Sequence, residues 1–265
     1  MKFSILINTH NQEKYLNKAI MSCLKQNFKN YEIIVCDTSE KKNNIISKRV
    51  IYNKKFQYFH LSPKYKQPEQ NQMYKILFGL KRAKGKFICL MDGDDYFNNK
   101  KLYNLNKLID KKKIFFNQDN PTLIKNNLII YKNIDKKKYK NNFLFNIFVN
   151  DWPQVYGTSS ILIKKEILQI FFKKAKPFTW KYLAIDAQLA IFCKINFRVT
   201  EYFGSITKKN IHDKNLGNDY LGLFRKKFWV RRYMQHKYYM YIKKEKKINI
   251  DYIFTTIAYY FFKNL

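Results

Sequence analysis

Residues 1–95 alternate short, nearly continuous apolar runs with stretches of helical periodicity. The runs are Phe3–Ile7, Tyr31–Cys36 and Lys86–Met91. Runs of this length without polar alternation are typical of strands that are buried on both faces, as in a parallel sheet. Between the first two runs, apolar residues recur every four positions from Tyr15 to Leu24, which indicates a helix with one apolar stripe. Strand, helix and strand in this order predict a βαβ unit.

Further elements continue the series along the chain. We expect strands at Phe56–His60, Leu128–Tyr131, Ser160–Ile163 and Phe197–Thr207, and helices near Gln70–Ala83, from Asn99 onward, at Glu166–Phe172 and at Ala184–Ile195. The series predicts an α/β domain over residues 1–218 and a basic, aromatic helical extension over residues 219–265. Ligands bind at the carboxyl ends of the strands in such sheets, so we expect the site directly after Ile7, Cys36 and Met91.

The sequence carries a large excess of positive charge. It has 52 Lys+Arg against 19 Asp+Glu residues, for a formal charge of +33. One interpretation is attraction to an anionic partner, such as nucleic acid, acidic lipid or a phosphorylated substrate. The other is compositional drift, because the basic residues are mostly lysine and the chain is also rich in Asn, Ile, Phe and Tyr. Composition alone leaves both open.

The cysteines and the apolar runs bear on the compartment. None of Cys23, Cys36, Cys89 and Cys193 belongs to a CxxC pair, so we expect buried thiols rather than disulfides or a zinc site. The chain starts on a strand pattern without a signal-peptide pattern, and no apolar run approaches the ~20 residues that span a bilayer. We therefore expect a cytoplasmic protein, either free or peripheral at the cytosolic face of the membrane.

An acidic cluster, Asp92-Gly93-Asp94-Asp95, directly follows the run that ends at Met91. Several carboxylates at one strand end repel one another unless a cation neutralises them. Mg²⁺ and Mn²⁺ prefer such oxygen ligands and often share them with substrate phosphates. A polar turn that caps the next helix is the alternative, but the position after a buried strand favours a metal site.

Three segments, FSILINTHN (3–11), YEIIVCD (31–37) and AKGKFICLMDGDD (83–95), follow one another in an order and spacing that resembles family 2 glycosyltransferases with a GT-A fold. The resemblance covers residues 1–215 and is densest before residue 97. It implies a GT-A-like nucleotide-binding fold with a mixed central sheet flanked by helices. It also implies inverting transfer from a nucleotide-sugar, with Mn²⁺ or Mg²⁺ as the cofactor.

The resemblance assigns residues to the donor and the metal. The implied nucleotide-sugar contacts are Asn8, Thr9, His10, Asn11, Asp37 and Asp92, with Asp37 near the base. Asp94 would be the main metal ligand, helped by Asp92 and by His212 of the late segment IHDKN (211–215), while Asp95 supports the metal site and borders the sugar pocket. The plainer interpretations are a turn or capping acid for Asp37 and a surface or core residue for His212.

The segment IDAQL (185–189) resembles the family's Glu-Asp-x-x-Leu element, which implies that Asp186 is the general base. The alternative is a first-turn acid that the helix dipole favours. Thr158 and Ser159, in GTSS (157–160), would shape the acceptor and sugar pocket, unless they only lead into a strand. Trp152 is placed in the same pocket, where it or Trp180 would stack on a sugar ring, with core packing as the alternative.

The chain departs from the family pattern at several positions. Asn8 stands where the family often has Pro, and Cys36 and Thr38 flank Asp37 where a second acid is usual. Ile76 and Leu77 replace an Arg-Asn pair, and Ile185 replaces the Glu before Asp186. An inactive relative is therefore one alternative.

Residues after about 220 mix cations with aromatic rings; they include Arg225, Lys226, Lys227, Arg231 and Arg232 together with Phe224, Phe228, Trp229, Tyr233, Tyr238 and Tyr239. This mixture suits an anionic membrane surface. The apolar residues do not collect on one clean helical face, so a solvated, basic packing helix is the alternative.

The sequence therefore predicts a glycosyltransferase that moves a sugar, from a UDP-sugar in particular, to a hydroxyl of a surface glycan or lipid-linked glycan. A sugar nucleotidyltransferase is an alternative, but residues 8–11 are not the Gly-rich, basic phosphate loop of that class. A basic nucleic-acid-binding protein is another, but no zinc or RNA-binding motif is evident.

Overall fold

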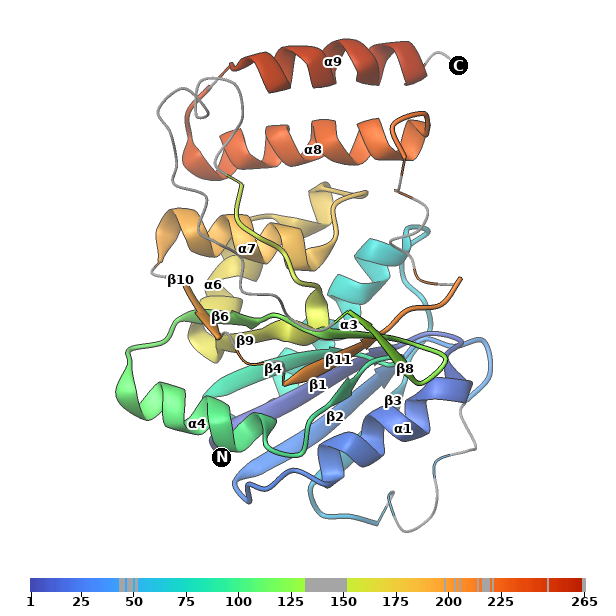
Figure 1. The fold of residues 1–265 in the computed structure, drawn as a ribbon, viewed down its shortest axis with the longest axis vertical. Helices are drawn as coiled ribbons and strands as arrows, with labels where there is room; N and C mark the ends of the chain where they lie inside the picture. Colours follow the sequence, from blue (N-terminus) through green and yellow to red (C-terminus); the bar gives the residue numbers. More distant parts are fainter. Residues whose placement is uncertain are drawn as a thin grey trace.

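The computed structural model describes residues 1–42, 46, 50, 52–131, 152–197, 199–202, 204, 206–213, 215, 220, 222–246 and 248–263. In this part of the chain, a seven-stranded sheet has the order β10-β6-β9-β4-β1-β2-β3 (Figure 1). Strand β9 is antiparallel to both neighbours and the other pairs are parallel, so the expected mixed sheet is confirmed. Its strands are β1 (Phe3–Thr9), β2 (Tyr31–Asp37), β3 (Phe56–His60), β4 (Phe87–Asp92), β6 (Phe116–Asp119), β9 (Ile161–Lys164) and β10 (Val199–Tyr202).

Helices cover both faces of this sheet, which explains why its central strands are buried and mostly apolar (Figure 1). In β1, Ile5 and Ile7 pack toward α1 (Glu13–Leu24) and α4 (Lys101–Lys111). Leu6, between them, packs toward α3 (Pro68–Arg82). Burial of each such side chain contributes about 1.5–3 kcal/mol.

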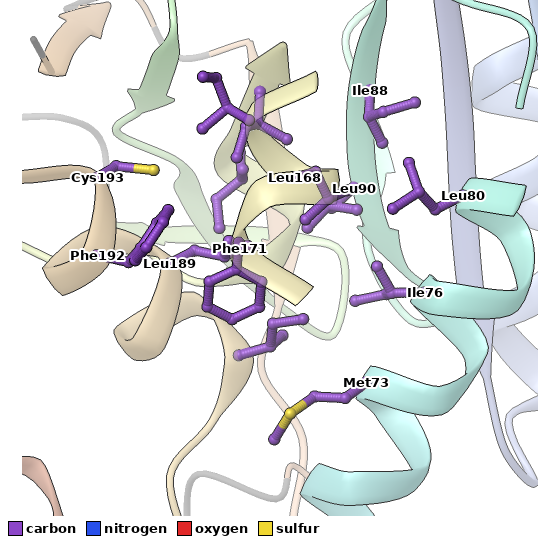
Figure 2. Packing of buried hydrophobic residues seen from close by; sticks show 14 of the residues in the cluster. Met73, Ile76, Leu80, Ile88, Leu90, Leu168, Phe171, Leu189, Phe192 and Cys193 are labelled. Atoms are coloured by element: carbon purple, nitrogen blue, oxygen red, sulfur yellow. The ribbon is translucent and has the colours of Figure 1, made fainter. Parts of the chain in front are cut away.

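The second core lies between α3 and the helices α6 (Lys165–Lys174) and α7 (Ile185–Asn196). In Figure 2, Ile76 and Leu80 of α3 and Leu168 of α6 gather around Leu90 of β4. This packing fixes β4, whose end carries the acidic cluster, between two layers of helices. Two short 3-10 helices, η1 (Thr158–Ser160) and η2 (Pro177–Thr179), precede β9 and α7.

Two C-terminal helices stack on α7, with α8 (Lys226–Lys243) between α7 and α9 (Ile250–Lys263) (Figure 1). Tyr238 of α8 is fully buried, and its hydroxyl donates a hydrogen bond to the carbonyl oxygen of Gln188 at 3.1 Å. The domain boundary that we predicted at residues 218 and 219 lies outside the described residues.

The single strand expected over Phe197–Thr207 is wrong. The described residues there form β10 in the large sheet and β11 (Thr207–Asn210) in a second sheet, whereas residues 198, 203 and 205 lie outside the description. The second sheet has the order β5-β11-β7-β8, with β5 at Tyr96–Phe97, β7 at Thr122–Lys125 and β8 at Leu128–Tyr131. The chain therefore passes from one sheet to the other, since β10 pairs with β6 of the large sheet, whereas β11 pairs with β5 and β7 of the second sheet.

A buried ion pair ties the two sheets together. The Nζ atom of Lys101 lies 2.9 Å from Asp119 Oδ1, and both side chains are fully buried. Lys101 also donates to the carbonyl oxygen of Ser159 at 2.9 Å and to Thr207 Oγ1 at 2.5 Å. One ammonium group therefore joins α4, β6, η1 and β11.

We expect Lys101→Met to destabilise the fold by about 3–5 kcal/mol, because it leaves the Asp119 carboxylate buried without its counter-charge. The matched control is Lys2→Met, which removes a 2.8 Å ion pair to the exposed Asp110 and costs about 0–1 kcal/mol. Urea unfolding measures both free energies. Equal losses in the two variants would contradict a structural role for the buried pair.

Candidate active site

The carboxyl ends of β1, β2 and β4 meet at one edge of the sheet. In the strand register, Asn8 stands opposite Asp92 and Thr9 stands opposite Asp37. The loops that follow these strands therefore lie side by side, and they border a cavity of about 840 Å³. This volume is within the range of pockets that hold small-molecule ligands.

Several parts of the fold line the cavity. They include the end of β1 with the loop after it (Asn8, Thr9, His10, Asn11), the end of β4 with the turn after it (Asp92, Asp94, Asp95), the loop after β2 (Thr38), α3 (Glu69, Gln72, Lys75), η1 with the glycine before it (Gly157, Thr158), the first turn of α7 (Asp186) and α8 (Arg231, Gln235). His212 and Lys209 also belong to the wall. The residues expected after Ile7 and Met91 are thus together.

The turn after β4 passes close to the turn after β1, which explains the glycine within the acidic cluster. A β-carbon at residue 93 would lie 2.6 Å from Thr9 Oγ1, closer than real Cβ atoms come to neighbouring heavy atoms. The amide of Gly93 donates to the carbonyl oxygen of Asn8 at 2.8 Å. Glycine therefore allows the three acids to be held against the end of β1 and the loop that follows it.

Two of the three carboxyl groups, those of Asp92 and Asp95, have raised pKa values. Burial raises the pKa of Asp95 to about 7, and the charge of Asp94 adds to this effect. Burial also raises the pKa of Asp92 well above its usual range, with further contributions from Asp94 and Asp95. A nearby positive charge would relieve this repulsion, because it favours the ionised carboxylates.

Hydrogen bonds from other elements hold each acid in place. Gln72 Nε2 donates to Asp92 Oδ1 at 2.7 Å, and the Asn210 amide donates to Asp95 Oδ1 at 2.9 Å. Asp94 Oδ2 lies 3.0 Å from His212 Nε2. The acidic cluster is therefore fixed by α3, by β11 and by the segment that follows β11.

His212 is aimed at Asp94 by its neighbours. Its ring stacks on Tyr15 at a centroid distance of 4.8 Å and an interplanar angle of 10°. Asn215 Nδ2 donates to the same Asp94 oxygen at 3.2 Å. The structure thus brings together Asp94 and His212, two of the three predicted metal ligands.

The donor set is carboxylate oxygen with one imidazole nitrogen, which fits Mg²⁺ or Mn²⁺ chemically. Across the described residues, no three His, Cys, Asp or Glu side chains are arranged closely enough to hold a metal ion. The metal site therefore stays a prediction that rests on the chemistry of these side chains.

Lys75 is a cation of the site that the sequence analysis missed. It is buried, and its Nζ donates to the carbonyl oxygen of Thr9 at 2.8 Å. Burial lowers the pKa of Lys75 to about 8, while Asp92 and Asp37 favour its charged form. In the sequence, Lys75 directly precedes Ile76 and Leu77, which stand where the family has an Arg-Asn pair. A lysine next to the missing arginine was the feature that could have identified it.

Asp186 lies in the first turn of α7 and lines the cavity. Its Oδ1 accepts a hydrogen bond from the Ala187 amide at 2.7 Å, a first-turn contact that agrees with the helix-terminus interpretation. Its charge also contributes to the raised pKa of Asp92. The geometry therefore fits both interpretations of Asp186, the helix-terminal acid and the general base.

The C-terminal helix α8 also belongs to the cavity wall, which the sequence analysis did not anticipate. Arg231 lies 3.3 Å from Glu69 Oε1, and its guanidinium lies 3.2 Å from the centroid of the Tyr220 ring. The Tyr220 hydroxyl donates to the same Glu69 oxygen at 2.5 Å. These contacts connect the extension to α3 at the rim of the site.

Three predicted site residues do not line the cavity. Asp37 is fully buried, and its carboxylate accepts hydrogen bonds from Ser39 and Tyr58, so it braces the loop after β2. Ser159 is buried behind the acids and accepts the Asp92 amide through Oγ at 2.9 Å. Trp152 packs edge-on against His236 and Tyr239 of α8, which agrees with core packing.

Comparison with known proteins agrees with this geometry. The profile described as "Glycosyl transferase family 2" matches residues 4–171, and the chain belongs to this family. Its mixed sheet and flanking helices form a GT-A-like fold.

Curated relatives match this chain over part of their length. A glycosyltransferase of Haemophilus influenzae without an assigned function is 34% identical over 101 residues, which cover 37% of this chain and 38% of that protein. The Escherichia coli protein named UDP-Glc:alpha-D-GlcNAc-diphosphoundecaprenol beta-1,3-glucosyltransferase WfgD is 30% identical over 146 residues, covering 53% and 54%. The chain thus matches about half or less of these relatives.

Solved structures share the fold at low sequence identity. Staphylococcus aureus TarS 1–349 in complex with UDP-GlcNAc has a TM-score of 0.65 and 16% identity, over 100% of this chain and 72% of that one. The mannosyltransferase PcManGT from Pyrobaculum calidifontis in complex with GDP-Man and Mn²⁺ has a TM-score of 0.61 and 10% identity, over 98% and 69%.

We expect Asp95→Asn to weaken the dependence of stability on pH. Because the pKa rises from 3.8 to about 7 on folding, the folded state keeps a proton that the unfolded chain releases between these values. The wild type therefore loses stability as pH rises from about 4 to 7, by on the order of 4 kcal/mol from this group. Asparagine has no such proton and removes this loss.

Urea unfolding at about pH 5 and about pH 8, with EDTA present, measures the effect. Asp110→Asn is the control, because that carboxylate is exposed. Identical pH dependence in wild type, D95N and D110N would contradict the raised pKa of Asp95.

Proposed function

We propose that this protein transfers a sugar from a nucleotide-diphosphate donor to a hydroxyl group of a glycan acceptor. One observation carries the proposal: a single cavity has Asp92, Asp94 and Asp95 at one wall and Asp186 on the first turn of the separate helix α7. A transferase needs both sets, one at the leaving diphosphate and one at the attacking hydroxyl. Membership of glycosyl transferase family 2 supports this reaction over nucleotidyl transfer.

The donor would lie across the ends of β1 and β4. The loop residues Asn8 to Asn11 and Thr38 offer polar groups to the nucleoside, and Lys75 sits beneath them. Lys209, His212 and Arg231 add cationic or imidazole groups around the same cavity. We propose a UDP-sugar in particular, because the relative WfgD is named for UDP-Glc and the similar TarS structure is a complex with UDP-GlcNAc.

Asp94, Asp92 and His212 would hold Mn²⁺ or Mg²⁺, with Asp95 behind them. When bound, the ion supplies positive charge where the diphosphate leaves. Burial and the neighbouring acids raise the pKa values of Asp92 and Asp95, and a bound cation would favour their ionised forms, which supports this placement. A complex of the structural neighbour PcManGT contains Mn²⁺.

The transfer itself is a single displacement with inversion. The acceptor oxygen forms a bond to the anomeric carbon while the bond from that carbon to the β-phosphate oxygen breaks. Asp186 accepts the acceptor's proton, and the nucleoside diphosphate leaves. A surface glycan or a lipid-linked glycan is the proposed acceptor, because WfgD is named for a diphosphoundecaprenol-linked acceptor.

We expect Asp94→Asn to weaken metal-dependent binding of UDP-glucose or UDP-GlcNAc at least tenfold, because it removes the proposed ligand oxygen charge. Isothermal titration with Mn²⁺ and with EDTA measures the donor affinity. Asp213→Asn is the matched control, since it removes an exposed acid next to His212. If wild type and D94N bind the donors equally in Mn²⁺, Asp94 is not a metal ligand.

We expect Asp186→Asn to keep donor affinity within about twofold but to slow release of the nucleoside diphosphate by about 10²–10⁴-fold, as loss of a general base does. The assay follows UDP release with water or a synthetic lipid-linked glycan as acceptor. Glu166→Gln, a first-turn acid of α6, is the control for a general effect of helix-terminal acids. Unchanged turnover in D186N would leave Asp186 with the helix-terminal role.

A further inference from the structure

The last helix, α9, exposes an apolar stripe. Its residues are Ile250, Ile253, Phe254, Ile257 and Phe261, each between 49% and 65% exposed. At about 100° per residue, these five positions fall within an arc of about 100° on the helix. Apolar side chains of this size at regular spacing on an outer helix indicate a contact surface.

The opposite face of α9 is fixed by contacts with α8. Tyr233 of α8 and Tyr259 stack at a centroid distance of 4.3 Å, and Arg232 Nη2 lies 2.6 Å from Asp251 Oδ1. Thr255, on the same inward face, is fully buried. These contacts set the rotation of α9, so the apolar stripe faces away from the rest of the described protein, at the outside of the helical layers in Figure 1.

The outward face carries almost no charge. Asp251 and Lys263 are the charged residues within α9, and Asp251 faces α8. With 14 residues, the helix is about 21 Å long. No helix in the described part of the chain is long and apolar enough to cross a membrane. A helix with this pattern can lie in the plane of a bilayer surface.

Cations flank both ends of the stripe. At one end, Lys226 Nζ donates to the carbonyl oxygen of Lys263 at 2.9 Å, which brings the exposed start of α8 beside the end of α9. Phe224, next to this contact, is 91% exposed. At the other end, Lys244 and Lys246 are exposed in the turn that leads into α9.

The charges distinguish between the partners that could cover this face. A second copy of the chain would bring two cation-flanked stripes together, which electrostatic repulsion opposes. Glu245, an exposed acid near the stripe, is already paired with Lys243 at 2.7 Å. A surface with anionic headgroups above an apolar layer matches both the stripe and its cationic ends.

We propose that the outward face of α9, with the cations at its two ends, docks the protein on the headgroup region of an anionic phospholipid bilayer. The helix lies parallel to the surface, with Ile253, Phe254 and Ile257 inserted below the headgroups. The lysines at the ends contact lipid phosphates. The docking itself does not depend on the proposed transfer reaction.

The position of α8 connects this surface to the cavity. Arg231 and Gln235 of α8 line the cavity, whereas Arg232 and Tyr233 of the same helix hold α9. Packed helices lie about 8–10 Å apart, and among the described helices α8 is the one between the docked helix and the cavity. If the proposed function holds, a lipid-linked acceptor in that bilayer lies within reach of the site.

Co-sedimentation of the full chain with large vesicles tests the docking surface without any donor or acceptor. We expect wild type to bind vesicles of phosphatidylcholine and phosphatidylglycerol, and to bind pure phosphatidylcholine vesicles at least tenfold less. Ile253→Gln with Ile257→Gln should reduce binding to the anionic vesicles at least tenfold. Lys244→Gln with Lys246→Gln should reduce it about threefold or more.

The matched control is Leu128→Gln with Ile129→Gln, which removes two exposed apolar residues from β8 and should change binding less than twofold. Thermal unfolding confirms that each variant is folded. Wild-type binding by the folded I253Q/I257Q variant would overturn the proposal, because the net charge alone would then account for the attraction. A concentration-dependent dimer that this variant abolishes, without vesicle binding, would overturn it in favour of a second copy.

The vesicle assay and the sugar-transfer assay test the two proposals independently. A protein that docks on anionic vesicles but turns over no donor keeps the docking surface and loses the proposed function. A protein that uses donors in solution but ignores anionic vesicles loses the docking surface alone.

Discussion

The burial of three carboxyl groups at the end of β4 is the constraint on which the site depends. Carboxylates held this close are costly unless a proton or a positive charge compensates them. Much of the surrounding structure responds to this cost. Gln72 comes from α3, Ser159 from η1, and the Asn210 amide from β11, and each bonds one of the acids or its backbone. The main contribution of the second sheet to the site is that its strand β11 leads to His212 and Asn215, which contact Asp94.

The C-terminal extension contributes to the site through α8, which packs against α7 and the cavity on one side and against α9 on the other. On one side, α8 packs Tyr238 against α7 and places Arg231 at Glu69. On the other side, it holds α9 through Arg232 and stacked tyrosines. A rigid helix that contacts both the cavity and an outer surface couples their positions by geometry. Part of the basic composition of α8 thus serves internal contacts, since Arg231 pairs with Glu69 and Arg232 pairs with Asp251.

The central βαβ units were predictable from sequence because both faces of their strands are covered, so residues 3–7, 31–36 and 86–91 are nearly continuous apolar runs. The acidic cluster was predictable because Asp92 follows a buried strand. The roles of Asp37, Ser159 and Trp152 were not, since the sequence does not tell whether a polar or aromatic side chain faces the cavity or braces its wall. Lys75 and Arg231 were missed because their function comes from contacts with residues at least 66 positions away. The apolar stripe on α9 was not evident from sequence, because residues 219–265 contain two helices. The aromatic residues of α8 face several directions, so the region as a whole shows no single apolar face.

The distribution of charge gives the +33 a structural meaning beyond composition. Many of the scarce acids, including Asp92, Asp94, Asp95 and Asp119, are buried or line the cavity, so exposed lysines dominate the remaining surface. Such a surface attracts anions from a distance, whereas the acids in the cavity repel a diphosphate at short range. A donor of the proposed kind can therefore be drawn to the protein by its overall field and still need a local cation at the acids. The same field favours an anionic bilayer, but net charge cannot orient the molecule on it. Orientation requires a specific apolar contact, and α9 presents one at the end of the molecule where the basic helix α8 already reaches the cavity.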